Sequence, residues 1–156
     1  NTPVRLGLGA TAVVWPPKIT PAEQHSLRTL LESLGLVVDL QQDQLDAFTA
    51  LAGSGPAYVF YFLEALQGAG ESVGLSPSDA RELSLSVVQG ASALLASGSK
   101  SAEEHRRDVT SPGGMTEAAI GHLQQVGWLD EMPQALAAAL RRATQLANAA
   151  ATAKDQ

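Results

Sequence analysis

The hydrophobic pattern of the first forty residues predicts a strand, a helix and a second strand. Glycines lead into the short apolar run 10–15, which the proline pair 16–17 ends. Residues 20–23 form a capping box with proline in the first helical turn. Gly35 is expected to take the left-handed position at the end of this helix, and the β-branched run 36–40 to form the second strand. Leucines at helical spacing mark the helix in between, namely Leu27, Leu30, Leu31 and Leu34.

From Asp43 onward the pattern is helical, because alanine, leucine, glycine and serine dominate and apolar residues recur every three or four positions. A boundary is therefore expected between residues 42 and 43. Helices are predicted between breaks at Gly53–Pro56, Gly74, Gly98, Val109–Thr116 and Gly127, and the last helix is expected from Asp130 to about Ala151. Small pairs such as Gly68-Ala69 allow close helix contacts, either within one subunit or between two interlocked copies.

Composition narrows the class of protein. The 156 residues suffice for one domain with a core, and 45% of them are hydrophobic. The formal net charge of −6 argues against nucleic acid as a partner. Apolar runs are too short to span a membrane. Cysteine is absent and the three histidines lack metal-ligand spacing, which predicts no metal site and fits a cytoplasmic location.

Two features of the first twelve residues concern nucleotide binding and the start of the chain. The pattern Gly7-Leu8-Gly9-Ala10-Thr11-Ala12 matches a dinucleotide fingerprint in letters, but a strand is expected after it instead of a helix. We therefore interpret it as a glycine turn before a strand. Asn1-Thr2-Pro3 has neither an initiator methionine nor signal-peptide character, so the sequence is expected to begin inside a longer chain.

The segment Ser111-Pro112-Gly113-Gly114-Met115-Thr116 is the most unusual stretch of the chain. Proline fixes one backbone angle, the glycines permit others, and Thr116 is placed to cap the following helix or to contact a ligand. Amides at a helix N-terminus suit a carboxylate or another small anion. An ordinary turn between helices explains the same residues, and the pattern leaves both interpretations open. The break at Gly53–Pro56 is likewise either a kink or a space for a ligand or partner.

Three segments together resemble pyrroline-5-carboxylate reductase in order and spacing along nearly the whole chain. They are Asn1-Thr2-Pro3 with Gly9-Ala10-Thr11, then Asp46–Tyr58 with its Gly-Ser-Gly-Pro-Ala-Tyr ending, and Val109–Thr116. The resemblance implies reduction of the cyclic imine 1-pyrroline-5-carboxylate to L-proline with NADH or NADPH, a step of proline biosynthesis.

The resemblance also implies an architecture. Residues 1–42 would be the C-terminal remnant of a Rossmann domain, and residues 43–156 an all-helical dimerisation and substrate-binding domain. The expected fold is thus mainly α, a helical bundle forming an interlocked dimer after a short β-α-β remnant. The cofactor would be bound mainly by an N-terminal domain upstream of Asn1, and the chain alone would be inactive. A homodimer is implied, and rings of dimers occur in the family.

Site residues follow from the same resemblance. The substrate carboxylate would be held by the Ser111 hydroxyl and the amides around Gly113, Gly114 and Met115, while Thr116 would hydrogen-bond the ring nitrogen as the catalytic residue. Asp108, shifted by one position from the family's acidic residue, would lie near the cofactor.

The sequence departs from the family at several positions. Gln41-Gln42 stand where an acidic residue is usual, Arg107 precedes the displaced Asp108, Ala52 replaces serine, and Met115 replaces threonine or alanine. These differences leave open a non-catalytic helical dimerisation module on the same scaffold. The C-terminal domain of another reductase with the same plan is a third interpretation.

Overall fold

The computed structural model describes residues 1–154, with the side chains of residues 148 and 150–154 left aside. The chain divides into two compact units, the first made of Asn1–Val59 and the segment from Gln134 onward, the second of Phe60–Pro133. Each unit is described separately below. The predicted boundary between residues 42 and 43 stays a prediction.

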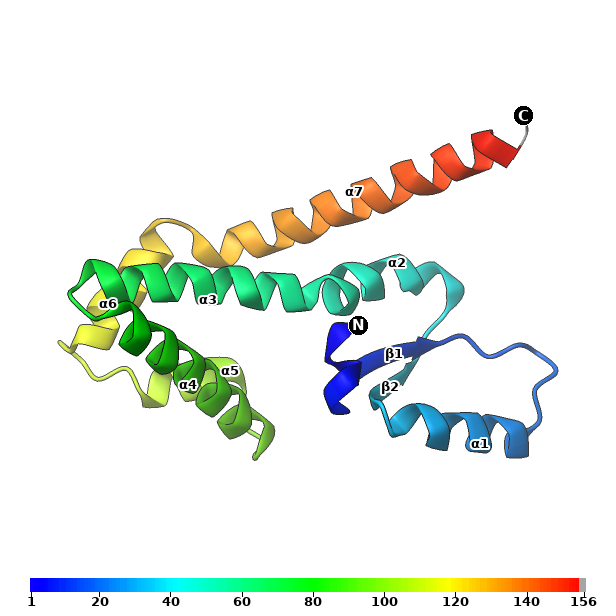
Figure 1. Ribbon diagram of the computed structural model, residues 1–156, viewed down its shortest axis with the longest axis horizontal. Helices are drawn as coiled ribbons and strands as arrows, with labels where there is room; N and C mark the ends of the chain where they lie inside the picture. The colour runs from blue at the N-terminus through cyan, green and yellow to red at the C-terminus, as the bar shows by residue number, and fades with distance from the viewer. Residues whose placement is uncertain (155–156) are drawn as a thin grey trace. The chain divides into compact units, whose positions relative to one another are not determined.

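The first unit opens with the predicted β-α-β arrangement. After the short 3-10 helix η1 (Thr2–Leu6), strand β1 (Gly9–Val13) runs parallel to strand β2 (Gly35–Asp39), with Gly9 opposite Gly35 and Val13 opposite Asp39. Helix α1 (Pro21–Glu32) connects the strands and lies beside them (Figure 1). Its capping box is present as predicted, since the Glu23 amide donates to the Thr20 hydroxyl (3.3 Å) and the Thr20 amide to the Glu23 carboxylate (2.9 Å).

The prediction that Gly35 ends the first helix was wrong. Helix α1 ends at Glu32 with Ser33 as its C-cap, and Gly35 is the first residue of β2 with φ of 134°. A Cβ at Gly35 would lie 2.1 Å from the carbonyl oxygen of Gly9 on the neighbouring strand. The glycine is therefore required by the close approach of the two strands, a tertiary cause that the local pattern does not reveal.

A polar cluster ties the far ends of the two strands to α1. The Trp15 indole donates to a carboxylate oxygen of Asp39 (2.8 Å), and the Arg28 guanidinium pairs with the same oxygen. The Arg28 guanidinium also lies 6.0 Å from the centre of the Trp15 ring. These contacts fasten α1 to the sheet that it crosses.

The predicted break at Gly53–Pro56 takes the form of a π-helical turn. A short 3-10 turn η2 (Gln42–Gln44) leads into α2 (Leu45–Phe48), which continues through the π turn η3 (Thr49–Gly53) into α3 (Gly55–Ser72). The Ser54 amide donates to the carbonyl of Thr49 (2.9 Å), five residues earlier, as a π turn requires. Such turns in a helix often accompany functional sites.

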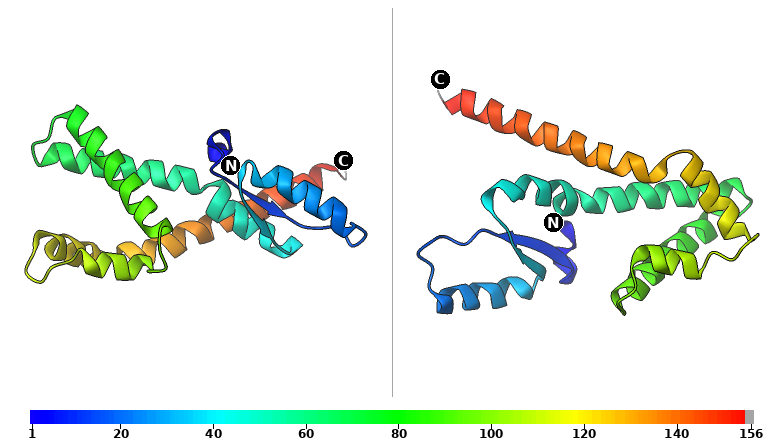
Figure 2. Two further views of the ribbon diagram at one scale, coloured as in Figure 1. Left: turned by 90° about the horizontal axis from the view of Figure 1, so that it is seen from below. Right: turned by 180° about the vertical axis from the view of Figure 1, so that it is seen from behind.

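Helices make up the second unit, as the sequence predicts. Helix α4 (Pro77–Ala96) begins at Ser76, whose hydroxyl accepts from the Asp79 amide (3.1 Å). It is followed by α5 (Ala102–Asp108) and α6 (Met115–Gln125). Helix α7 (Trp128–Lys154) begins in this unit, carries Pro133 in its interior, and from Gln134 onward belongs to the first unit (Figures 1 and 2). The fold is therefore mainly α after a small parallel β-α-β unit, which confirms the expected fold class. None of the described helices is long and apolar enough to cross a membrane.

Little of the single chain is buried. Among the described residues, the buried hydrophobic side chains are those of Ala50 and Ala80, both small. Large apolar side chains on several helices stay exposed, including Phe60 (60%) and Leu83 (52%). Large apolar side chains exposed on several helices are typical of a chain that completes its core against a partner.

Candidate functional site

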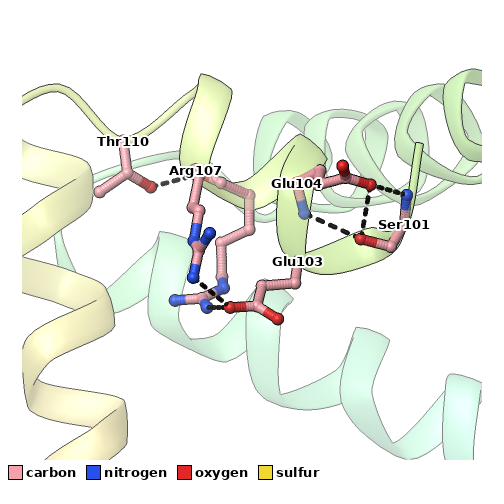
Figure 3. Close-up of polar contacts among 6 residues, drawn as sticks. Ser101, Glu103, Glu104, Arg107 and Thr110 are labelled. Carbon is pink, nitrogen blue, oxygen red and sulfur yellow. Dashed lines mark hydrogen bonds and ion pairs between the residues drawn. The ribbon is translucent and has the colours of Figure 1, made fainter.

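The glycine-rich loop 109–114 lies between α5 and α6. Helix α5 begins with a complete capping box. The Glu104 amide donates to the Ser101 hydroxyl (3.2 Å), and the Ser101 amide donates back to the Glu104 carboxylate (2.7 Å), as Figure 3 shows. These hydrogen bonds, the backbone one first, hold the pKa of Glu104 below its ordinary value. The box fixes where this short helix begins.

The C-terminal end of α5 carries the chain into the loop. The Arg107 guanidinium donates to Glu103 one turn earlier (2.7 Å), and the Thr110 hydroxyl donates to the carbonyl of Arg106 (2.5 Å). Figure 3 shows both contacts on the last turn of the helix. Thr110 thereby satisfies a carbonyl that the end of the helix leaves without a backbone partner.

Ser111–Gly114 form a tight turn. The Gly114 amide donates to the Ser111 carbonyl (3.0 Å), Pro112 takes the second position, and Gly113 takes the third with φ of 71°. Proline followed by a residue of positive φ is the signature of a type II turn. A Cβ at Gly114 would lie 3.0 Å from the Ser111 carbonyl oxygen, so both glycines have a structural reason.

Helix α6 starts directly after this turn, and its N-cap is Gly114. The option that Thr116 caps the helix is therefore excluded, because Thr116 is the second helical residue and no side-chain cap is formed. A glycine in extended conformation (φ −85°, ψ 169°) takes the cap position instead, which glycine does at little cost. The Thr116 hydroxyl thus remains available to a ligand.

The backbone amides around the turn fall into two groups. The Gly113 amide donates to the carboxylate of Glu117 (2.8 Å), and the Gly114 amide to the Ser111 carbonyl (3.0 Å), so both are engaged within the loop. Within the described part of the chain, the amides of Met115, Thr116 and Glu117 have no such acceptor. As first-turn amides they point out of the helix and carry the positive end of its dipole.

Side chains at this helix start are open to solvent. Met115 is 92% exposed, and Ser111 and Thr116 are also exposed. The hydroxyls of these two residues make no hydrogen bond to other described residues. The structure therefore brings Ser111, Gly113, Gly114, Met115 and Thr116 together in one turn and the helix start after it, while their binding roles stay predictions.

Asp108, the last residue of α5, has a partner of its own. Its carboxylate accepts from the Lys100 ammonium at 2.6 Å. This hydrogen bond and the charge of Lys100 hold the pKa of Asp108 below its ordinary value. Its predicted position near a cofactor stays a prediction.

Two residues that matter to the local geometry were missed in the sequence. Glu117 accepts from Gly113, and an acidic residue at the third position of the expected helix was the available signal. Asn1 bonds to Ala10 and to Ala52, which lies fifty-one positions away along the chain. No local pattern gives that second contact.

The pattern at Gly7–Ala12 is a turn before a strand, as interpreted. Gly7 ends the 3-10 helix η1 with φ of 69°, and Gly9 and Ala10 are already part of β1. A pyrophosphate site needs the glycine-rich turn to open a helix. Residues 7–12 therefore do not fit a dinucleotide.

An apolar groove of about 1060 Å³ lies within the second unit. Phe62 and Trp128 meet edge to face across 6.1 Å in its wall. Leu66, Ile120 and Leu123 add aliphatic surface, and Arg106 is a charged residue on its lining. Its size and apolar lining suit a protein side-chain surface better than a small anionic ligand.

Fold and loop together define a class: a mainly helical domain that follows a parallel β-α-β unit and presents open amides at a helix N-terminus. Residues 42–146 match the family model for the pyrroline-5-carboxylate reductase dimerisation domain. The chain belongs to this family, which confirms the resemblance seen in the sequence.

Curated relatives and solved structures agree. A pyrroline-5-carboxylate reductase of Pseudomonas aeruginosa is 40% identical over 94% of this chain and 54% of its own length, and one of Synechocystis is 35% identical over 94% and 55%. The Coxiella burnetii enzyme structure aligns with a TM-score of 0.89 at 36% identity over 94% of this chain and 54% of that one. The NADP-bound Plasmodium falciparum enzyme gives 0.83 at 25% identity over 91% and 57%. The chain spans about half the length of these relatives.

Proposed function

We propose that this chain is the substrate-binding and dimer-forming part of a pyrroline-5-carboxylate reductase, which reduces 1-pyrroline-5-carboxylate to L-proline. Family membership and the relatives' names support the reaction. The observation that carries the site is the group of open amides at the start of α6, of which those of Met115 and Thr116 come first.

The substrate carboxylate would sit on these two amides, with the Ser111 hydroxyl as a further donor. Hydrogen bonds from amides to a carboxylate are charge-assisted and stronger than neutral ones. The Gly113 and Gly114 amides are engaged in the turn, so the glycines would act mainly by shaping it. The Gly113 amide would become a donor to substrate only after Glu117 has moved away from it.

Thr116 would act at the ring nitrogen. During reduction a hydride adds to the imine carbon and the π pair of the C=N bond becomes a lone pair on nitrogen. That nitrogen would take up a proton that comes from solvent water through the Thr116 hydroxyl, and the product would be a protonated amine. A hydroxyl held one residue beyond the carboxylate site can donate a hydrogen bond to the nitrogen and orient the ring. This role explains why Thr116 should be free of the helix cap.

The Gly7–Ala12 turn opens a strand, so it does not fit the pyrophosphate of a dinucleotide. The cofactor, NADH or NADPH, would be bound mainly by residues outside this chain and would supply the hydride. Asp108 would lie near it only at the margin, because its carboxylate is held by Lys100. The chain alone would accordingly show no turnover.

A homodimer is proposed as the working form, and rings of dimers are a compatible higher assembly. The dimerisation family and the exposed apolar side chains of the helices support it. The net charge of −6 keeps nucleic acid an unfavourable partner, and a cytoplasmic location stays a prediction.

Steady-state kinetics of the full-length protein with 1-pyrroline-5-carboxylate and NADPH test the proposal. Thr116→Val keeps the shape of the side chain and removes the hydroxyl, so kcat should fall about 10²-fold, the usual scale for losing a positioned proton-transfer group. Thr110→Val, which loses a hydroxyl bonded to Arg106 instead, is the matched control and should retain kcat.

Unchanged kinetics in Thr116→Val would remove this residue from the mechanism. A full-length wild-type protein that dimerises but neither turns over nor binds proline would instead favour the non-catalytic module.

A further inference from the structure

The π turn η3 leaves a backbone carbonyl without its normal partner. In a regular helix the carbonyl of Ala52 would accept from the amide of residue 56, but that residue is Pro56 and has no N–H. The Ala57 amide, next along the chain, is already taken by the Ser54 carbonyl (2.9 Å). Neither of these two positions therefore supplies a donor to the Ala52 carbonyl.

Asn1 supplies the missing donor. Its side-chain amide nitrogen donates to the Ala52 carbonyl at 2.8 Å, and its side-chain oxygen accepts from the Ala10 amide at 3.1 Å. One carboxamide thus bridges the start of β1 and the π turn. Both contacts lie within the first unit.

The second contact falls on the free edge of β1. The Gly9 amide donates toward the β2 side, to Leu34 (2.9 Å), and successive amides of a strand point to opposite edges. The Ala10 amide therefore faces the edge of β1 away from β2, where Asn1 satisfies it. A strand added on that edge could accept next only from the Ala12 amide.

A neighbouring side chain completes the π turn. The Tyr58 hydroxyl donates to the carbonyl of Ala50 (3.0 Å), and Ala50 is only 5% exposed. Side chains thus satisfy two carbonyls of the turn. Tyr58, which is part of α3, donates to Ala50, and Asn1, which precedes β1, donates to Ala52. Of these two side chains, that of Asn1 is the one that also bonds to β1.

We propose that Asn1 is a positioning residue that fixes the junction of α2 and α3 to strand β1. This inference rests on the proposed function for its kinetic consequence, because the strand unit would belong to the cofactor-binding part and α3 to the substrate-binding part. A looser junction leaves each ligand bound but misplaces the reacting atoms, and a misplacement of 1 Å costs about 10²-fold in rate.

Three variants of the full-length protein test the bridge. Asn1→Asp keeps the oxygen that accepts from Ala10 but loses the donor to Ala52, and Asn1→Ala loses both. Pro56→Ala returns a backbone amide to the Ala52 carbonyl, so it should make the Asn1 donor redundant. The readouts are hydrogen exchange of the Ala10 and Ser54 amides, and kcat and KM.

Asn1→Asp should accelerate exchange at Ser54, leave Ala10 protected, and lower kcat about tenfold with KM changed less than about twofold. Asn1→Ala should expose both amides. In the Pro56→Ala background, Asn1→Asp should lose most of its effect on kcat, a coupling that a loss of general stability would not produce.

Unchanged exchange at both amides and unchanged kcat in Asn1→Ala would overturn the proposal, as would equal losses with and without Pro56. The exchange experiment needs no turnover. A wild-type protein without reductase activity would therefore contradict the proposed function, while exchange would still decide whether the bridge exists.

Discussion

At the scale of single residues, the candidate site depends on which backbone amides are free. Gly113 and Gly114 have amides bonded to Glu117 and Ser111, while the next two residues begin α6 with amides open to a ligand. The glycine-rich loop and the anion site are therefore adjacent but not identical. Glycine provides the turn, and the first residues of the helix provide the donors.

Met115 allows this distinction to be tested with one atom. Met115→Pro removes the amide N–H at the first helical position, where proline is well tolerated, and the preceding Gly114 already has the extended conformation that proline requires. The free energy with which the full-length variant binds free L-proline, measured by calorimetry, should weaken by about 1.5–3 kcal/mol, the usual contribution of a hydrogen bond to a charged group.

Met115→Ala keeps the amide and is the control. Equal affinity of Met115→Ala and Met115→Pro for L-proline would show that the Met115 amide does not contact the carboxylate.

At the scale of elements, short helices here depend on their caps. Helix α5 starts with the Ser101–Glu104 capping box. An ion pair joins Lys100, just before this box, to Asp108, the last residue of the helix. Both carboxylates have a lowered pKa, for Glu104 through hydrogen bonds from Ser101 and for Asp108 through Lys100. Both contacts therefore weaken in acid.

The acid sensitivity of α5 has a defined direction. Because the pKa of folded Glu104 lies below its ordinary value of 4.5, its contribution to stability is complete above that pH and is lost as pH falls through the lowered value. The Glu104 amide resonance, followed by NMR from pH 7 to 2.5, should shift with this titration. In Glu104→Gln, which still accepts from the Ser101 amide but does not titrate, the step should vanish. Its persistence would assign the transition to another group.

Elements defined by local chemistry could be predicted from the sequence, and those defined by distant contacts could not. The caps at Thr20, Ser76 and Ser101 are each encoded within four residues, and the box predicted at residues 20–23 formed as expected. Gly35 was wrongly assigned to a helix end. Its real constraint is the close approach of Gly9 on another strand, which the local sequence does not reveal. The break before Pro56 was visible, but the hydrogen bond from the distant Asn1 to the Ala52 carbonyl in its π turn was not.

The site shows the same division. Pro112, Gly113 and Gly114 predicted a turn, and the structure confirms that turn and the helix after it. The option that Thr116 caps the helix was wrong, because Gly114 takes the cap position, which glycine does at little cost. Glu117 went unnoticed because its contact with Gly113 depends on where α6 starts.

At the scale of the whole molecule, the described part of the chain buries few hydrophobic side chains. Its buried hydrophobic residues, within the described part, are two alanines, whereas aromatic and aliphatic side chains of several helices are exposed. Two alanines cannot stabilise more than a hundred ordered residues against their conformational entropy. A second copy of the chain, as proposed from its membership of a dimerisation family, would cover this surface.

The stability of the assembly should consequently depend on protein concentration. Sedimentation equilibrium should give twice the 16.2 kDa mass of the chain or a multiple of that, and the Tm should rise with each tenfold increase in concentration. A monomer with cooperative unfolding and a constant Tm would contradict the dimer.

The most direct measurement of the central claim is a titration of the full-length wild-type protein with L-proline, followed by backbone amide NMR. Our account predicts that the largest shifts fall on the amides of Met115 and Thr116, with smaller shifts at Gly113 and Gly114. Shifts centred on other residues, or no saturable shift, would contradict a substrate carboxylate at the start of α6.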